Sequence, residues 1–491
     1  MSVQKIRGSS SRKEKSAATG SSGDLILAGR NIPFFVGIFT MTATWVGGGY
    51  INGTAEAVAD PGQGLIWLIA PWGYAISLIL GGKFFAVKMR SLGFTTMLDP
   101  FEIRYGKKTA ALLFIPALIG EVFWSSAILT ALGTTFGVVL GFDFQTSILI
   151  SSAVAVAYTA LGGLMAVAYT DVIQLFCILV GISIAVPFVT DSHGGFFASW
   201  DLYKIKMGES AHLFPDLKFI MGKSGFTWID SVLLLALGGI PWQVYFQRVL
   251  SAPSPKKAKQ LSYIAAVGCI IMAIPSIWIG IAGATADWEA LNIPAPPSYS
   301  IILPYVIQYL TPPIIATIGL SAVAAAVMSS VDSSILSASS MFFWNVYRPF
   351  SKDKNLDAKK IKKIVQTGIL VVGITATIIS LQVQSVYSLW FLCADLVYVV
   401  LFPQLTMALF LKKANKIGAI SGFIVSIFLR IGGGEPTFNF GAFLPYPDEN
   451  FPIRTFSMLS GLLTIIAVSY LTQKINPSIP LTTNKIGKIN E

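Results

Sequence analysis

Several aromatic residues lie well inside apolar segments, whereas Trp and Tyr of membrane proteins usually gather at segment ends. They are Trp45, Tyr50, Tyr74, Trp124 and Trp242. Ring faces attract a quaternary ammonium, which donates no strong hydrogen bond, and each face contributes about 0.5–2 kcal/mol. Three or four desolvated faces could reach the roughly 8 kcal/mol that micromolar affinity requires. The pattern indicates a cage for a small organic cation.

Two of these residues lie at interruptions of apolar segments. Trp45 precedes Gly47-Gly48-Gly49, and Trp242 ends the run Gly238-Gly239-Ile240-Pro241. Each glycine weakens a helix by about 1 kcal/mol relative to alanine, and proline removes a backbone donor. Paired broken helices at matching positions of inverted repeats indicate the midplane site of a secondary transporter. The alternative is that the glycines only allow close helix packing.

A hydroxyl-rich stripe follows a later segment at three- and four-residue spacing, so its members share one helix face. They are Ala326, Ser329, Ser330, Ser333 and Ser337. Hydroxyls and freed backbone carbonyls are hard oxygen ligands suited to an alkali cation, although such a stripe also joins helices. Asp332 lies beside them at a depth where a charge is costly, with almost no basic partner in the spans. Glu121 and Asp395 are expected to be hydrogen-bonded structural acids.

The composition predicts an all-α polytopic membrane protein. Of 491 residues, 54% are hydrophobic and 12% are charged, against about a quarter charged in soluble domains. The polar residues 1–30 contain no apolar core and are not a signal peptide. No GxxxxGK[ST] sequence supports ATP hydrolysis, and three cysteines inside apolar segments imply no disulfide framework. No nucleophile–base or metal constellation indicates an enzyme, and no cofactor is expected.

About twelve membrane-spanning helices are predicted, because a span needs about 20 apolar residues. They cover 31–54, 64–86, 110–139, 144–166, 168–189, 226–250, 259–287, 312–345, 360–381, 386–411, 416–433 and 452–473. Twenty-eight Lys and Arg fall in the tails and alternate loops, against four in the others, which predicts that both ends are cytoplasmic. The predicted organisation is a cytoplasmic tail (1–30), a five-helix repeat (31–189), an extracellular loop (190–225), a second repeat (226–411), two further helices (412–473) and a short tail (474–491).

Several motifs resemble those of the sodium:solute symporter family, and in particular of its choline-transporting members. The resemblance runs from about Leu27 to about residue 475. The motifs are Thr40-Met41-Thr42-Ala43-Thr44-Trp45-Val46-Gly47-Gly48-Gly49-Tyr50, Met97-Leu98-Asp99-Pro100-Phe101, Val167-Ala168-Tyr169-Thr170-Asp171-Val172, Gly238-Gly239-Ile240-Pro241-Trp242, Phe246-Gln247-Arg248-Val249-Leu250, Ala326-Val327-Met328-Ser329-Ser330-Val331-Asp332-Ser333-Ser334 and Gly433-Gly434-Glu435-Pro436.

The resemblance implies the inverted five-helix repeats of the amino acid–polyamine–organocation (LeuT-like) fold. It also implies sodium-driven, chloride-dependent choline uptake for acetylcholine synthesis, in the plasma membrane of presynaptic terminals and in synaptic vesicles. Its choline cage falls on Trp45, Tyr74, Trp124 and Trp242 of this sequence. Its sodium site falls on Ala43, Val46, Ala326, Ser329 and Ser330, and Asp332 matches an acid associated with a further ion. The family's additional first span, which precedes the repeats, does not occur in this sequence.

Two other functions fit the same pattern. The first is a sodium symporter of the same fold for another small solute, such as a sugar or proline. A sugar site would need amides and carboxylates where Trp45 and Tyr74 stand. The second is a receptor or channel that kept the fold without transporting. Accumulation of choline inside cells distinguishes transport from both.

Overall fold

The regular secondary structure is helical in the residues described by the computed structural model, which are 27, 30–161, 164–192, 194–352, 356–448 and 450–481. An isolated bridge between Glu435 and Phe440 is the exception within these ranges. Ten helices are long and apolar enough to cross a membrane, and two shorter helices that meet at a bend make an eleventh span. Most of the two predicted tails, 1–30 and 474–491, lies outside the described residues.

The first predicted repeat (31–189) contains five spans. Its helices are α3 (Phe34–Trp45), α4 (Gly48–Ala59), α5 (Ala70–Leu80), η3 (Gly81–Ala86), α6 (Val87–Leu92), α7 (Asp99–Tyr105), α8 (Lys107–Leu140), α9 (Phe144–Leu161) and α10 (Leu164–Asp191). The bent pair α3 and α4 is one span, and α5 continues through the π-helical turn η3 into α6 as another. The short helix α7 connects the second and third spans.

The second predicted repeat (226–411) has the same number of spans. Its helices are α13 (Lys223–Gly238), α14 (Gln243–Ser251), α15 (Pro255–Thr285), α17 (Pro313–Met341), η6 (Phe342–Tyr347), α18 (Arg348–Phe350), α19 (Ala358–Ser380), α20 (Val386–Leu396), η7 (Val397–Leu401) and α21 (Phe402–Phe410). Two helices follow, α22 (Lys416–Gly432) and α23 (Ile453–Leu471). Helix α22 corresponds to the predicted span 416–433 and has 17 residues, at the short end of what crosses a membrane.

Short helices cover one end of the bundle. The predicted loop 190–225 contains α11 (Phe196–Met207), η4 (Gly208–Ala211) and α12 (Leu217–Ile220). Residues 288–311 lie between the predicted spans 259–287 and 312–345 and are not predicted to be helical, but their end forms η5 (Tyr299–Ile301) and α16 (Ile302–Leu310), and α16 packs against α4, α15 and α17. Apolar side chains at most positions of α16 explain the difference, since Ile302, Leu303 and Val306 are fully buried there.

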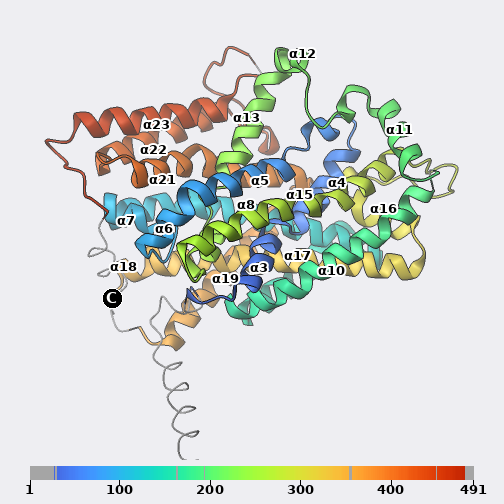
Figure 1. The fold of residues 1–491 in the computed structure, drawn as a ribbon, viewed down its shortest axis with the longest axis horizontal. Helices are drawn as coiled ribbons and strands as arrows, with labels where there is room; N and C mark the ends of the chain where they lie inside the picture. Colours follow the sequence, from blue (N-terminus) through green and yellow to red (C-terminus); the bar gives the residue numbers. More distant parts are fainter. Residues whose placement is uncertain are drawn as a thin grey trace, which may run out of the picture.

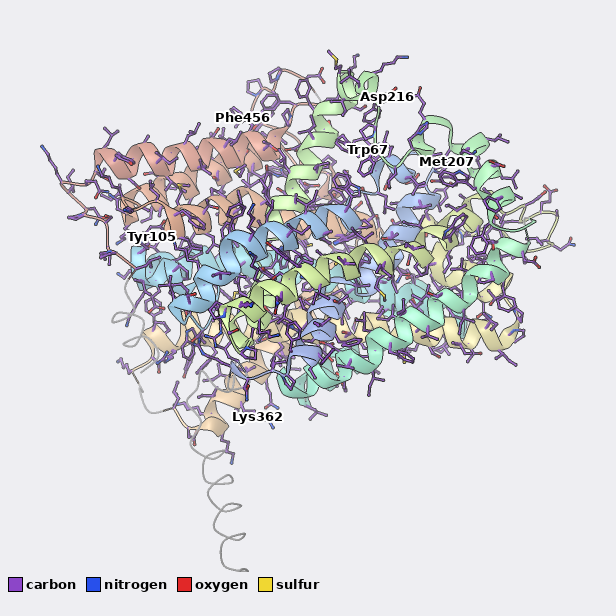
Figure 2. All side chains as sticks on the ribbon, in the orientation of Figure 1. Trp67, Tyr105, Met207, Asp216, Lys362 and Phe456 are labelled. Carbon is purple, nitrogen blue, oxygen red and sulfur yellow. The ribbon has the colours of Figure 1, made fainter. Side chains whose placement is uncertain are left out.

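Helices from both repeats pack together at the centre of the molecule. Helix α17 packs against α10 and α8, α8 packs against α20, and α4 packs against α15. Figure 1 shows the long helices α8, α10, α15 and α17 running roughly along the horizontal axis, with α7 and α18 toward the left end and α11 and α16 toward the right. Figure 2 accordingly labels Tyr105 at the left end and Met207 toward the right. Helices of the two predicted repeats therefore meet along α8, α17 and α20.

The outward faces of several spans are strongly apolar. Ile173 and Phe176 of α10 are 67% and 63% exposed, and Val267 of α15 is 58% exposed. Water-facing surfaces rarely carry such continuous apolar patches. These faces are consistent with contact with lipid.

Helix α7, in the connection between the second and third spans, buries a basic residue. Arg104 is only 6% exposed. Its guanidinium donates hydrogen bonds to the carbonyl oxygens of Ala408, Lys412 and Ile479, each at 3.0 Å. Ala408 and Lys412 lie at and just beyond the end of α21, where a helix leaves its last four carbonyls without intrahelical donors. Arg104 therefore attaches α7 to the end of the tenth span.

Candidate functional site

The first span is broken at the position indicated by its glycines. Helix α3 ends at Trp45 and α4 begins at Gly48, and the two axes differ by 46°. The amide of Val46 still donates to Thr42 O, and the amide of Ile51 donates to Gly47 O. The carbonyls of the last turn of α3 lose their helical donors at this break. Ala43 and Val46 lie on this interrupted turn.

The same glycines allow close packing against α17. A Cβ atom on Gly47 would lie 1.4 Å from Oγ of Ser330, and one on Gly48 would lie 2.0 Å from Cγ2 of Val327. A Cβ on Gly49 would have its nearest neighbours at 3.8 Å, which is ordinary contact. The break and the close packing, which the sequence presented as alternatives, therefore occur together.

The sixth span is interrupted as predicted, but more gently. Helix α13 ends at Gly238, α14 begins at Gln243, and Trp242 between them has extended backbone. The two helices form one span without a bend above 40°. The glycines bring α13 close to two neighbours, because a Cβ on Gly238 would lie 2.8 Å from Cβ of Tyr398, and one on Gly239 would lie 2.5 Å from Oγ of Ser77.

Five distant segments contribute rings to one cavity beside the first break. It is lined by Trp45, Gly47, Tyr50, Tyr74, Trp124, Trp242, Val244, Trp390 and Cys393. All four predicted cage residues are in this set. The ring centroids of Trp45 and Tyr74 lie 4.8 Å apart, and those of Trp124 and Trp242 lie 5.5 Å apart. The structure thus brings these residues together around a common space.

The cavity is narrow. Its free volume is about 20 Å³. That is room for about one water molecule. A trimethylammonium group therefore needs the rings to move apart as it enters.

Trp390 of α20 also lines the cavity and was not identified from the sequence. Its ring lies 5.6 Å from that of Tyr50 and 5.5 Å from that of Tyr74. It is 2% exposed. No glycine or proline adjoins Trp390 in the sequence, so nothing distinguished it from the tryptophans expected at membrane interfaces.

The predicted sodium ligands are divided between three locations. Ser330 faces the broken turn, and its hydroxyl lies 3.4 Å from Ala326 O as a hydrogen-bond donor. Ser329 donates to Oδ1 of Asp171 at 2.5 Å. Ala43, Val46, Ala326 and Ser330 therefore lie around the break, whereas Ser329 is turned toward α10.

Asp332 lies on the far side of α17 from the break. Its Oδ1 accepts a hydrogen bond of 2.5 Å from Thr159 of α9. Its Oδ2 is buried and has no partner among the described residues. The Asp332 side chain therefore faces α9, whereas Ser330 faces the broken turn.

A buried ion pair adds a basic residue within the spans, where almost no basic partner was predicted. Arg248 was counted with a cytoplasmic loop, but α14 continues to Ser251 and buries it to 2% exposure. Its NH2 lies 3.6 Å from Oδ2 of Asp171 and donates to Oγ of Ser333 at 2.7 Å. Thr40 of α3 donates to the same Asp171 at 2.5 Å. Asp171 and Arg248 thus connect α3, α10, α14 and α17.

The other two intramembrane acids are hydrogen-bonded, as expected. Glu121 accepts hydrogen bonds from Ser334 and Ser337 of α17, both at 3.0 Å. Asp395 forms ion pairs with Arg430 and with Arg454. Within the described ranges, no group of three or more His, Cys, Asp and Glu side chains could hold a metal ion.

Comparisons with known proteins agree with this architecture. The sodium:solute symporter family matches residues 25–426. The human high affinity choline transporter 1 is 50% identical over 480 residues, which cover 94% of this chain and 81% of the relative. The corresponding transporters of Drosophila melanogaster and Caenorhabditis elegans are each 47% identical, and the matches cover 94% and 95% of this chain and 75% and 81% of those proteins.

Solved structures show the same fold at lower identity. A substrate-bound Na⁺-coupled sialic acid symporter in an outward-open state has a TM-score of 0.76 and 21% identity, with 93% of each chain covered. A nucleobase-cation-symport-1 family transporter with bound bromovinylhydantoin has a TM-score of 0.56 and 12% identity, with 94% of this chain and 97% of that chain covered. The predicted all-α, LeuT-like membrane fold is confirmed.

Proposed function

Because the chain belongs to the sodium:solute symporter family, we propose that it is a secondary transporter that takes up choline together with sodium by alternating access. Its relatives are transporters, and it is a transporter rather than an enzyme. The observation that supports choline as the substrate is the single cavity lined by Trp45, Tyr74, Trp124 and Trp242. Five aligned relatives with the name high-affinity choline transporter, including those of Torpedo marmorata and the mouse, share 47–50% identity with the chain.

The ring cage suits the chemistry of a trimethylammonium group. This group is cationic, apolar at its surface and unable to donate a strong hydrogen bond, so ring faces attract it better than hydroxyls or amides do. Four rings at about 0.5–2 kcal/mol each supply roughly 2–8 kcal/mol. No acidic residue lines the cavity, so in this proposal the rings provide the attraction for the positive charge.

Sodium in this proposal binds at the break between α3 and α4. The ligands are the carbonyls of Ala43, Val46 and Ala326 and the hydroxyls of Ser329 and Ser330. Ser329 would have to turn from Asp171 toward the break to join this set. We assign Asp332, whose Oδ2 is unpartnered, to a further ion.

Gly47 links the two proposed sites. It lines the ring cavity, and its Cα lies against the hydroxyl of Ser330. Sodium that fixes the broken turn would also fix Trp45, two residues earlier. In this way sodium binding favours the arrangement of rings that holds choline, and choline binding favours sodium by the same amount.

The membrane potential drives both cations inward. Each elementary charge that crosses 100 mV gains about 2.3 kcal/mol. Choline carries one charge and each co-transported sodium another. The basic loops between the spans are placed on the cytoplasmic side in this proposal, because Lys and Arg accumulate there.

The resemblance to choline-transporting members extends the proposal in three respects. Transport depends on chloride, the choline supplies acetylcholine synthesis, and the protein resides in the plasma membrane of presynaptic terminals and in synaptic vesicles. Replacement of chloride by gluconate in an uptake assay tests the first of these directly.

Uptake of labelled choline into cells that express the chain tests the proposal. We expect accumulation above that of untransfected cells in sodium, and background accumulation when lithium replaces sodium. Accumulation of labelled proline or glucose instead would indicate a symporter for another solute. Ligand-gated current without any accumulation would indicate a channel-like protein.

A further inference from the structure

Trp45 carries an unused hydrogen-bond donor beside the ring cavity. Its side chain lines the cavity and is 8% exposed. The indole Nε1 is buried and has no hydrogen-bond partner among the described residues. Buried polar groups in native proteins nearly always have a partner, so this N–H indicates a ligand atom that accepts a hydrogen bond.

Two other polar groups of the cavity are already engaged. The hydroxyl of Tyr50 donates to Cys269 O at 2.6 Å, and the thiol of Cys393 donates to Trp390 O at 2.9 Å. Two further indoles with unpartnered N–H groups, Trp72 and Trp344, do not line this cavity. The free donor of Trp45 is thus distinguished from these two by its location beside the cavity.

Choline offers one atom that matches this donor. Its three methyl groups and its ammonium nitrogen accept no hydrogen bond, whereas its hydroxyl oxygen, two carbons away, does. We propose that the indole N–H of Trp45 donates a hydrogen bond to the hydroxyl oxygen of choline, so that Trp45 determines specificity for the alcohol while the ring faces bind the ammonium. This inference rests on the proposed function.

The position of Trp45 supports this double role. Its ring packs against Tyr74 at 4.8 Å and against Tyr245 at 6.4 Å, which fixes the ring from two sides. An N–H on a fixed ring loses little conformational freedom when it binds. A site built to hydrogen-bond a hydroxyl discriminates against an analogue that lacks it, because the donor is then left unpaired.

The experiment compares three cations as inhibitors of labelled choline uptake. Ethyltrimethylammonium lacks the oxygen of choline, and 2-methoxyethyltrimethylammonium keeps an accepting oxygen without an O–H. We expect unlabelled choline to inhibit about tenfold more strongly than ethyltrimethylammonium, the ratio that one buried hydrogen bond provides. The methoxy analogue should inhibit more strongly than ethyltrimethylammonium as well.

The decisive change replaces Trp45 by 3-benzothienylalanine through nonsense suppression. This residue keeps the shape of the indole and substitutes sulfur for N–H. The ratio between choline and ethyltrimethylammonium should fall from about tenfold to about one, while ethyltrimethylammonium itself still inhibits. The same replacement at Trp242 is the matched control and should leave the ratio near tenfold, even if it weakens both cations.

The proposal is overturned if the replacement at Trp45 leaves the ratio unchanged, or if the replacement at Trp242 removes it equally. If suppression yields too little protein, Trp45→Phe and Trp242→Phe provide the same comparison of ratios. A chain with no sodium-dependent choline uptake at all would instead contradict the proposed function.

Discussion

Replacement of Gly47 by alanine tests whether the broken helix connects the two proposed sites. The added Cβ would lie 1.4 Å from Oγ and 2.5 Å from Cβ of Ser330, and both atoms are fully buried on α17. Rotation of the hydroxyl alone cannot relieve the contact with Cβ, so the broken turn and α17 must separate. We expect Gly47→Ala to disrupt the sodium site without unfolding the bundle.

The size of the effect follows from the overlap. Overpacking of one methyl group in a well-packed interior costs about 1–3 kcal/mol. If this cost destabilises the sodium-bound state but not the sodium-free state, the sodium concentration for half-maximal uptake rises by about 5- to 150-fold. Because sodium and choline are coupled through the same turn, the apparent affinity for choline at fixed sodium should fall as well.

The assay measures labelled choline uptake as a function of sodium concentration, corrected for transporter at the cell surface. Gly49→Ala is the matched control, because its Cβ would meet only ordinary contacts at 3.8 Å and alanine favours the helix by about 1 kcal/mol. Wild-type sodium activation in Gly47→Ala would refute the reasoning. Equal damage by the two substitutions would show that the local overlap is not the cause.

Further predictions concern the cage, the sodium ligands and the buried charges. Trp45→Ala should raise the KM for choline and Ser330→Ala should weaken sodium activation; unchanged kinetics in both would remove the site assignment. Arg248→Met leaves Asp171 without its buried partner and should cost about 3–5 kcal/mol of stability, which is measured as a loss of protein at the cell surface. Addition of Asp171→Asn to this variant should partly restore the surface protein. A single Arg248→Met variant as stable as the double variant would contradict this. A quaternary-ammonium methanethiosulfonate should inactivate uptake by modifying Cys393, which lines the cavity, and bound choline should slow this modification. Inactivation that persists in Cys393→Ala would place the reactive thiol elsewhere.

Much of the fold is predictable from the sequence because a membrane demands long apolar helices with satisfied backbones. The positions of both helix interruptions could be predicted from the glycines at 47–49 and 238–239, because a break in a membrane helix leaves backbone groups that must be satisfied elsewhere. The sequence could not show that Gly47 and Gly48 also contact α17, since close approach depends on the partner helix. The eleventh predicted span, α22, was predicted from its composition and has only 17 residues in the structure.

Most of the aromatic residues that line the cavity could be predicted from residue type and position, but the pairing of buried charges could not. Trp45, Tyr74, Trp124 and Trp242 stood out because they lie within spans, whereas Trp390 resembled an interfacial tryptophan. Arg248 looked like a loop residue because it lies near the end of its span. Only the packing of α14 against α17 and α10 reveals that it faces Asp171, which is a tertiary contact without a local signal.

The central claim is that ring faces hold the positive charge of choline within the cavity. Calorimetry of the purified protein in sodium can compare choline with 3,3-dimethylbutan-1-ol, in which carbon replaces the ammonium nitrogen and the shape is retained. At least 2 kcal/mol of cation–π attraction from four rings predicts that the neutral alcohol binds about 30-fold or more weakly than choline. Equal binding of the two molecules would contradict the account.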